Sequence, residues 1–295
     1  MSKKHPVIAV TGSSGAGTTT VKRAFEHIFF REKINAAVIE GDSFHSLSRV
    51  DFKAAVKKAE AEGNFSFSHF GPQSNHFDKL AELFKTYGET GGGKKRYYIH
   101  SDEEAAEHNK RLNTSLNPGE FTPWEDVPAG SDVLFYEGLH GLVKTDDVDV
   151  SKHVDLGIGV VPIVNLEWIQ KIHRDGAERG YSADVIVDTI LRRMPDYVNY
   201  ITPQFSRTDI NFQRVSTVDT SNPFITRDIP TPDESFIVIR FRNPEGVDFP
   251  YLLNMIPNSF MSRRNTIVVP GAKMGFAMEL ILAPLIQDMI ANKNK

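Results

Sequence analysis

The sequence predicts an α/β protein whose mixed, largely parallel sheet is flanked by helices. Short runs of β-branched and aromatic residues, each bounded by turn residues, recur along the chain. In the first half of the chain, segments with apolar residues at helical spacing separate these runs. Such alternation is typical of a parallel sheet covered by helices on both faces, in which ligands bind at the carboxyl ends of the strands.

The predicted elements follow one another without a clear linker. Segments with the composition of strands are Val7–Val10, Ala36–Ile39, Arg96–Ile99, Val133–Tyr136, Val154–Val160, Val215–Val218, Phe236–Phe241 and Thr266–Val269. Segments with the periodicity of helices are Thr19–Glu32, Val50–Glu62, Phe77–Thr86, Asn165–Arg174, Ala183–Tyr200 and Lys273–Asn292. We therefore expect a single domain over residues 1–295, with an insertion at about 60–130 and a C-terminal strand and helix extension.

The composition excludes several classes of protein. The 295 residues include 34 basic and 38 acidic side chains, which give a formal charge of −4, and no cysteine. Without cysteine the chain cannot form disulfides, Cys-ligated zinc sites, iron–sulfur clusters or thiol nucleophiles. Mild acidity disfavours a dedicated nucleic-acid binder. The apolar run at Pro6–Val10 is too short for a signal sequence or a membrane span, so we expect a cytoplasmic protein without nucleic-acid or membrane partners.

The segment from Val7 to Thr20 has the pattern of a phosphate-binding loop. An apolar strand leads through a turn rich in glycine and serine into a helix, and Thr19 occupies the position whose hydroxyl binds Mg²⁺ in P-loops. Thr18 stands where the pattern has lysine, so a cation must reach the β- and γ-phosphates from elsewhere. An ordinary glycine-rich turn is the alternative. The candidate nucleotide-binding residues are Gly12, Ser13, Ser14, Gly15, Ala16, Gly17, Thr18, Thr19 and Thr20.

Carboxylates follow two of the predicted strands. Asp42 and His45 come just after Ala36–Ile39, and Glu137 ends the strand Val133–Tyr136 where a Walker B carboxylate would stand. Phosphoryl transfer to an alcohol needs a base near the acceptor hydroxyl and a metal site, and Asp42 and Glu137 could divide these roles. The alternatives are a helix cap for Asp42 and a surface turn for Glu137.

One predicted helix carries charged residues at helical spacing. Lys171, Arg174 and Asp175 fall at i, i+3 and i+4, and Arg179 lies four residues further on. If this face closes over the nucleotide, Lys171 and Arg174 supply the positive charge that the loop lacks, and the closed helix excludes water. The alternative is a solvated helix with internal ion pairs.

A second cationic pattern follows Asp42. His45, Arg49 and Lys53 recur every four residues, which would give one helix a positive face suited to an anionic acceptor such as a sugar phosphate. Ordinary solvent-facing charge is the alternative.

Several segments together resemble one known family. These segments are Gly12–Thr20, Glu40–His45, Phe135–Gly141, Asn165–Asp175, Asp209–Arg214, Val238–Asn243 and Ile267–Gly271. The chain is similar here to the bacterial type of phosphoribulokinase, within the P-loop phosphoribulokinase/uridine kinase family, and the similarity covers nearly the whole chain. The resemblance implies an adenylate-kinase-like P-loop kinase fold. It also implies phosphorylation of D-ribulose 5-phosphate by ATP and Mg²⁺ at the C1 hydroxyl, giving ribulose 1,5-bisphosphate, the CO₂ acceptor of the Calvin cycle.

The resemblance also implies catalytic roles at matching positions. Asp42 would be the general base. Glu137 and Asp175 would serve the Mg²⁺ and transition-state site. Lys171 and Arg174 would contact the transferring phosphate. The residues that would bind the sugar phosphate are His45, Arg49, Lys53 and Arg179.

Assembly and regulation follow from the same resemblance. It implies a homo-octamer that is activated by NADH and inhibited by AMP. Positions associated with this regulation are Arg31, Arg240 and Arg263. The stretch from about Lys94 to Pro123 departs from the family in length and composition, so the resemblance assigns no role to His100.

Two other functions remain open from the residues. A nucleoside kinase of the uridine kinase type shares the strand, the loop, the helix and the Asp after the second strand, but it needs aromatic recognition of a base. A nucleotide-dependent regulator would bind ATP or GTP as a switch and would not need Asp42.

Overall fold

A mixed sheet forms the centre of the protein. The computed structural model describes residues 4–12, 18–161, 163–226 and 228–292, without the side chains at positions 18, 19, 178 and 179. In this part of the chain the sheet has eight strands. In their order across the sheet they are β2 (Ala36–Glu40), β5 (Val133–Gly138), β1 (Val7–Gly12), β6 (Leu156–Val161), β7 (Ile210–Ser216), β8 (Ser235–Phe241), β10 (Thr266–Pro270) and β9 (Phe260–Arg263).

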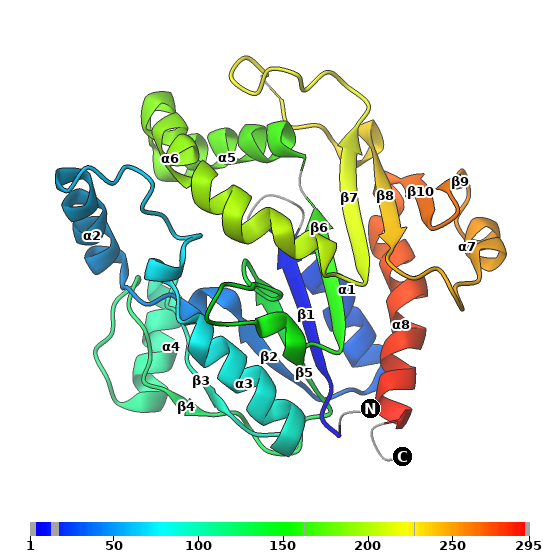
Figure 1. Cartoon of the computed structure of the whole chain (residues 1–295), viewed down its shortest axis with the longest axis horizontal. Helices are drawn as coiled ribbons and strands as arrows, with labels where there is room; N and C mark the ends of the chain where they lie inside the picture. Colours follow the sequence, from blue (N-terminus) through cyan, green and yellow to red (C-terminus); the bar gives the residue numbers. More distant parts are fainter. Residues whose placement is uncertain (1–3, 13–17, 162, 227, 293–295) are drawn as a thin grey trace.

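The strand directions agree with the predicted fold class. From β2 to β7 all neighbouring strands run parallel, and β8, β10 and β9 extend the sheet with antiparallel pairs (Figure 1). The expectation of a mixed, largely parallel sheet is confirmed. Because the carboxyl ends of the parallel strands meet at one edge, residues that follow β1, β2, β5 and β6 lie near one another.

Helices pack on both faces of the sheet. On one face α1 (Thr18–Glu32) and α8 (Met274–Asn292) lie side by side (Figure 1). On the other face α3 (Phe77–Thr90) covers β2, β5 and β1. β1 is therefore buried on both sides, which explains its unbroken apolar sequence. Ile8 packs into the core with α1 and α8, and its neighbour Ala9 packs into the core with α3.

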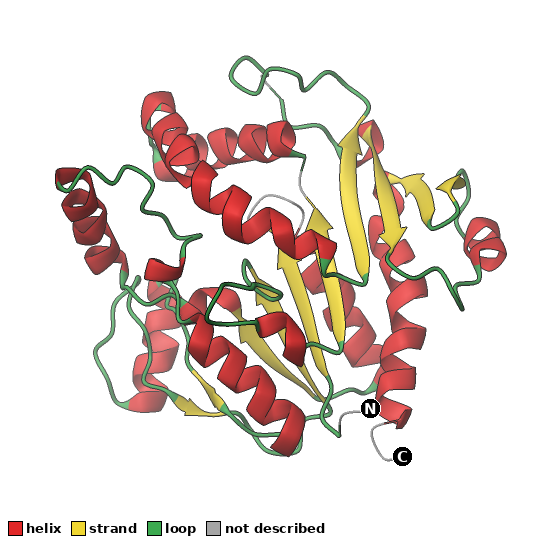
Figure 2. Ribbon diagram, in the orientation of Figure 1, coloured by secondary structure: helices red, strands yellow, loops and turns green. Residues whose placement is uncertain are grey.

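The remaining elements lie in the connections between the strands. Between β2 and β5 the chain forms α2 (Arg49–Ala61), α3, β3 (Lys94–Lys95), α4 (Asp102–Leu112) and β4 (Glu125–Asp126). After β6 come α5 (Val164–Arg179) and α6 (Ala183–Asp196), which lie beyond the carboxyl ends of the parallel strands (Figure 2). The short α7 (Phe249–Met255) precedes β9.

The closing helix has the length and hydropathy of a membrane span. Within the described residues, Gly271–Asn292 is the only helix that reaches this threshold, with a mean hydropathy of 1.5. A core helix of a globular protein reaches it too. Ala277, Met278 and Leu282 are completely buried against the sheet and α1, so the core explains the apolar character of this helix.

Two predicted strands are wrong or displaced. Arg96–Ile99 is no strand, because only Tyr98 forms an isolated bridge, with Phe121. The strand predicted at Val215–Val218 is β7, which begins five residues earlier at Ile210. Its outward-facing positions are polar, so the first half lacks the apolar run that marks a strand. α4, α7 and β9 were not predicted, since none of them has a full apolar repeat.

Candidate active site

The phosphate-binding loop joins β1 to α1 at the carboxyl edge. β1 ends at Gly12, where a Cβ atom would lie 2.8 Å from the Val160 carbonyl oxygen of β6, so the close approach of these strands leaves room only for glycine. Thr20 is exposed on the first turn of α1. The other candidate residues of the loop lie outside the described part, entirely or by their side chains: Ser13, Ser14, Gly15, Ala16, Gly17, Thr18 and Thr19.

Two carboxylates stand side by side at the ends of β2 and β5. Glu40 and Glu137 are register partners on these parallel strands. The Lys22 ammonium on α1 lies 3.1 Å from the Glu40 carboxylate. Its positive charge also opposes the rise in the pKa of Glu137. Burial, with a further contribution from the negative charge of Asp42, raises the pKa of Glu137 to about 7. A buried carboxylate that is costly to ionise is a favourable place for a cation.

Two glycines allow the turn after β2 to reach β5. A Cβ atom at Gly41 would lie 2.8 Å from the Cα atom of Gly138 and 2.6 Å from the Tyr136 hydroxyl oxygen. Gly41 begins a 3₁₀ turn at this contact, and Asp42 is its second residue. The close packing of the two glycines therefore fixes where the Asp42 carboxylate stands relative to Glu137.

Histidines surround the Asp42 carboxylate. His45 Nε2 lies 3.3 Å from one carboxylate oxygen, and His100 Nε2 lies 4.0 Å from the other. Burial alone would raise the pKa of Asp42, but the hydrogen bond from His45 and the positive charge of the histidines outweigh it and lower the pKa to about 2. The Asp42 side chain keeps 45% of its surface exposed, so solvent moderates this effect. The N-cap of the following helix α2 is Ser48, so the helix-cap alternative for Asp42 is wrong.

The pattern of His45, Arg49 and Lys53 is only partly helical. α2 begins at Arg49, with Ser48 as its N-cap, so Arg49 and Lys53 share one exposed helical face. His45 precedes this helix and turns toward Asp42. The expectation of one helical face with all three residues is therefore wrong, because a helix cannot start until the chain has left the turn after β2.

The charged residues of α5 are buried rather than solvated. Lys171 and Asp175 are 9% and 3% exposed and form an ion pair one turn apart. The Arg174 guanidinium donates to the other Asp175 oxygen at 3.1 Å. Burial, reinforced by the positive charge of Arg193, lowers the pKa of Lys171 to about 8. The side chain of Arg179, on the last turn of α5, lies outside the described part.

His69 lies where the surroundings of Asp42 and the cations of α5 meet. Its ring stacks on Phe52 with the centroids 3.5 Å apart and lies 5.2 Å from the His45 ring. Burial, then the positive charges of His45, Arg193 and Lys171, lower the pKa of His69 well below its usual value. The structure thus brings the base candidate and the cationic helix into one site. Neither His69 nor its neighbour Asn75 carries a local signal in the sequence.

The three arginines associated with regulation do not meet within one chain. Arg240 and Arg263 both pair with Thr266, so they belong to one cross-strand row and project from the same face of the sheet. Arg31 lies on α1, which covers the opposite face, and donates to Glu279 of α8 at 2.8 Å. Among the described residues, therefore, only Arg240 and Arg263 come together.

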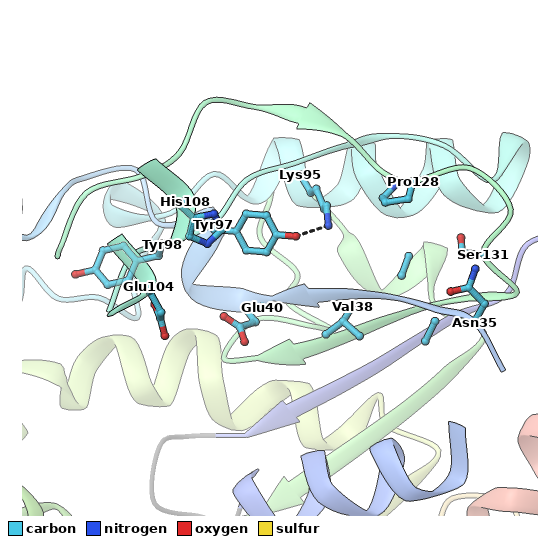
Figure 3. Close-up of a pocket in the computed structure, with 12 residues that line it drawn as sticks. Asn35, Val38, Glu40, Lys95, Tyr97, Tyr98, Glu104, His108, Pro128 and Ser131 are labelled. Carbon is cyan, nitrogen blue, oxygen red and sulfur yellow. Dashed lines mark hydrogen bonds between the residues drawn. The ribbon is translucent and has the colours of Figure 1, made fainter. Parts of the chain in front are cut away.

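A cavity runs along the outer edge of β2 (Figure 3). It has a volume of about 420 Å³ and lies between this strand, Lys95 and Tyr97 above it, and His108 of α4. Asp42 and Lys171 do not line it. The candidate catalytic residues lie instead at the carboxyl ends of the strands, where carboxylates, histidines and cations come together.

The donor set at the strand ends suits Mg²⁺. In the described part of the chain no three His, Asp or Glu side chains gather into a complete metal cage. Mg²⁺ in nucleotide enzymes needs no such cage, since one or two carboxylates and the substrate phosphates provide its oxygen ligands. The partly buried Glu137 carboxylate matches this requirement.

Comparison with known proteins gives one consistent match. The model of the family described as "Phosphoribulokinase / Uridine kinase family" matches residues 7–221. The phosphoribulokinase of Nitrobacter vulgaris is 60% identical over 295 residues, which is the full length of both chains. The chromosomal phosphoribulokinase of Cupriavidus necator is 59% identical and is covered to 99% of its length.

A solved structure agrees with these sequence matches. Phosphoribulokinase from Rhodobacter spheroides superposes with a TM-score of 0.90 at 53% identity, and each chain is covered completely. The expected P-loop kinase fold is confirmed by this likeness.

Proposed function

Since the chain belongs to the phosphoribulokinase/uridine kinase family, we propose that it transfers the γ-phosphoryl group of ATP to the C1 hydroxyl of D-ribulose 5-phosphate. The product is ribulose 1,5-bisphosphate, the CO₂ acceptor of the Calvin cycle. The observation that carries this proposal is the 60% identity to a phosphoribulokinase over the whole length of both chains. A protein that catalyses this reaction is a phosphotransferase with an alcohol acceptor. The proposal also takes the whole chain as a single domain.

Asp42 acts as the general base in this proposal. The His45 hydrogen bond keeps its carboxylate ionised, so it is always free to accept the proton of the C1 hydroxyl. A carboxylate with a low pKa is a weak base. Phosphoryl transfer passes through a loose transition state in which the acceptor oxygen gains little charge before the phosphoryl group arrives, so a weak and well-placed base suffices.

The cations of α5 replace the missing P-loop lysine. Lys171 and Arg174 contact the transferring phosphoryl group. Ion pairs with Asp175 hold both side chains in place before the substrates bind. Because they are largely buried, their charge acts in a medium that screens it less than water does. His45, Arg49, Lys53 and Arg179 bind the phosphate end of the acceptor.

Mg²⁺ and ATP bind at the carboxyl edge of the sheet. Thr19, Glu137 and Asp175 would hold the metal ion, and the loop Gly12–Thr20 would hold the phosphates. When bound, Mg²⁺ neutralises charge on the phosphate oxygens.

Assembly and regulation complete the proposal. The protein works in the bacterial cytoplasm as a homo-octamer that NADH activates. Arg240 and Arg263 share one face of the sheet, whereas Arg31 lies across it. An effector that contacts all three must therefore use Arg31 of a second subunit.

The acceptor is tested by incubating the purified protein and MgATP with ribulose 5-phosphate or with uridine. We expect transfer to ribulose 5-phosphate only. Transfer to uridine would show that the protein is a nucleoside kinase of the same family. ATP hydrolysis without transfer to either acceptor would leave a nucleotide-dependent regulator.

A further inference from the structure

We propose that Asn75 is a positioning residue that holds His45 with a proton on both ring nitrogens, pointed at Asp42. The proposal deepens the proposed function, because it rests on Asp42 as the base. Asn75 lies in the segment between α2 and α3, thirty residues from His45. It is 8% exposed, and its backbone forms an isolated antiparallel bridge with that of His45.

The hydrogen bonds of Asn75 fix the orientation of its amide. One terminal atom lies 2.8 Å from the carbonyl oxygen of His69 and 2.7 Å from that of Gly71. Carbonyl oxygens only accept hydrogen bonds, so this atom must be the nitrogen, Nδ2. With the amide turned over, an oxygen would face two oxygens at hydrogen-bond distance. Oδ1 therefore points the other way, toward His45.

The fixed amide determines where His45 carries a proton. Asn75 Oδ1 lies 2.8 Å from His45 Nδ1, and because that oxygen can only accept, Nδ1 must donate. A neutral imidazole protonated at Nδ1 would present the lone pair of Nε2 to the Asp42 carboxylate 3.3 Å away. A second proton, on Nε2, converts this repulsion into a charge-assisted hydrogen bond.

The neighbouring charged groups act on His45 in both directions, since the guanidinium of Arg96, which donates to the His45 backbone carbonyl, brings a positive charge close to the ring and Asp42 brings a negative one. The ionised Asp42 holds the pKa of His45 above its usual value against the opposing effects of burial and of Arg193. His69 is kept neutral, and His100 lies 4.0 Å from the second Asp42 oxygen. Asp42 is the one carboxylate with a contact to the His45 ring among the described residues.

The backbone holds Asn75 and His45 at this distance. Ser46 N donates to the Ser74 carbonyl at 2.9 Å, and His76 N donates to the Phe44 carbonyl at 2.8 Å. These bonds flank the bridge on both sides, so the amide and the imidazole keep their register. Asn75 thus supports an imidazolium that stays positive beside an anionic acceptor and keeps Asp42 ionised.

Two substitutions of Asn75 distinguish positioning from simple packing. Asn75→Leu removes the acceptor for Nδ1 and should lower the pKa of His45 by about one to two units. Asn75→Asp keeps an acceptor and adds negative charge, so it should raise that pKa by about one unit or more. A residue that only fills space would not shift the His45 pKa in opposite directions in these two variants.

The pKa of His45 is measured by NMR titration of ¹⁵N-labelled histidine rings, with the signal assigned by its loss in His45→Gln. Asn64 lies in the same inter-helix segment, and its side chain accepts from Ser66 N without touching His45. Asn64→Leu and Asn64→Asp therefore serve as matched controls, in which the pKa of His45 should not move. If Asn75→Leu does not fold, the pKa of His45 in Asn75→Asp tests the proposal on its own, and it should be higher than in wild type.

Shifts of the same sign in both Asn75 variants, or no shift in Asn75→Asp, would overturn the proposal. The alkaline limb of kcat/KM for ribulose 5-phosphate should move with the measured pKa, to lower pH in Asn75→Leu and to higher pH in Asn75→Asp. The NMR result needs no turnover, so it remains decisive even if ribulose 5-phosphate proves not to be the acceptor.

Discussion

Lys171 and Asp175 form an ion pair that is almost completely buried, one turn apart on the helix that follows β6. Burying two charges is costly, and removing one partner leaves the other charge in a poor environment. Arg174 also bonds Asp175, so the carboxylate has two cations. A helix that only needed solubility would leave these groups in water. Their burial argues against the alternative of a solvated helix with internal ion pairs.

Lys171→Met tests whether this cation acts in the transition state. We expect kcat to fall by about 10²–10³-fold, more than KM for ribulose 5-phosphate rises, because the contact to the moving phosphoryl group forms mainly during transfer. Lys57→Met, at an exposed position of α2, is the control. Steady-state kinetics with an unchanged kcat would leave Lys171 with a structural role only.

Asp42→Asn tests the base. The substitution preserves shape but removes the ability to accept the hydroxyl proton, so kcat should fall by about 10²–10⁴-fold or more. Asp146→Asn, at an exposed position, should leave kcat unchanged. Thermal unfolding of both variants shows whether the fold is intact. Full activity in a folded Asp42→Asn protein would remove Asp42 from the chemistry.

Glu137→Gln tests the pH dependence of stability. Burial raises the pKa of Glu137 to about 7, so the folded protein holds a proton that the unfolded chain has released. The free energy of unfolding therefore decreases as pH rises between about 4.5 and 7. Without metal ion, Glu137→Gln should be more stable than wild type by about 1–2 kcal/mol at about pH 8 and no more stable at about pH 4.5.

Urea unfolding at the two pH values measures this difference. Glu107→Gln, exposed on α4, is the control and should show no such dependence. A stability change in Glu137→Gln that is the same at both pH values would mean that Glu137 is ionised in the folded protein. Added MgATP should stabilise wild type more than Glu137→Gln, because a negatively charged carboxylate binds the cation more strongly than a neutral amide does.

Gly41→Ala tests the close contact behind Asp42. The new Cβ atom would meet Gly138 Cα at 2.8 Å, so the turn must shift. We expect a loss of about 1–3 kcal/mol in the free energy of unfolding, with reduced kcat because Asp42 moves. Gly275→Ala, in α8 with nothing near its Cβ position, should stabilise the protein by about 0.5–1 kcal/mol. Equal effects of the two substitutions would contradict this account.

The sequence predicted the parts of the candidate site whose signals are local. The strand and loop at Val7–Thr20, the carboxylates after two strands and the charged helix all have short patterns, and the structure places Asp42, Glu137 and Lys171 at one edge. Such patterns arise because strand ends and helix faces impose their own spacing.

The parts that were missed depend on distant contacts. Asn75 is notable only because it lies beside His45, thirty residues away in the sequence. His69 is notable only because it lies near cations on a different helix. The two-residue strands β3 and β4 are too short to have a periodicity, and α4 is largely polar. No local sequence pattern indicates these contacts, because they form only when the chain folds and brings distant residues together.

β2 and β5 are neighbours in the sheet although about ninety residues separate them in the sequence, and parallel neighbours need a crossover of only about a dozen residues or more. The long excursion leaves the sheet at the carboxyl end of β2 and rejoins it at the amino end of the adjacent β5. It carries His45, His69, Asn75 and His100 and leaves out the nucleotide loop and α5. If His45, Arg49 and Lys53 bind the acceptor as proposed, exchanging this excursion would change most of the acceptor site, except for Arg179 of α5, and would leave the ATP-binding frame intact. One scaffold can in this way serve kinases for different alcohols.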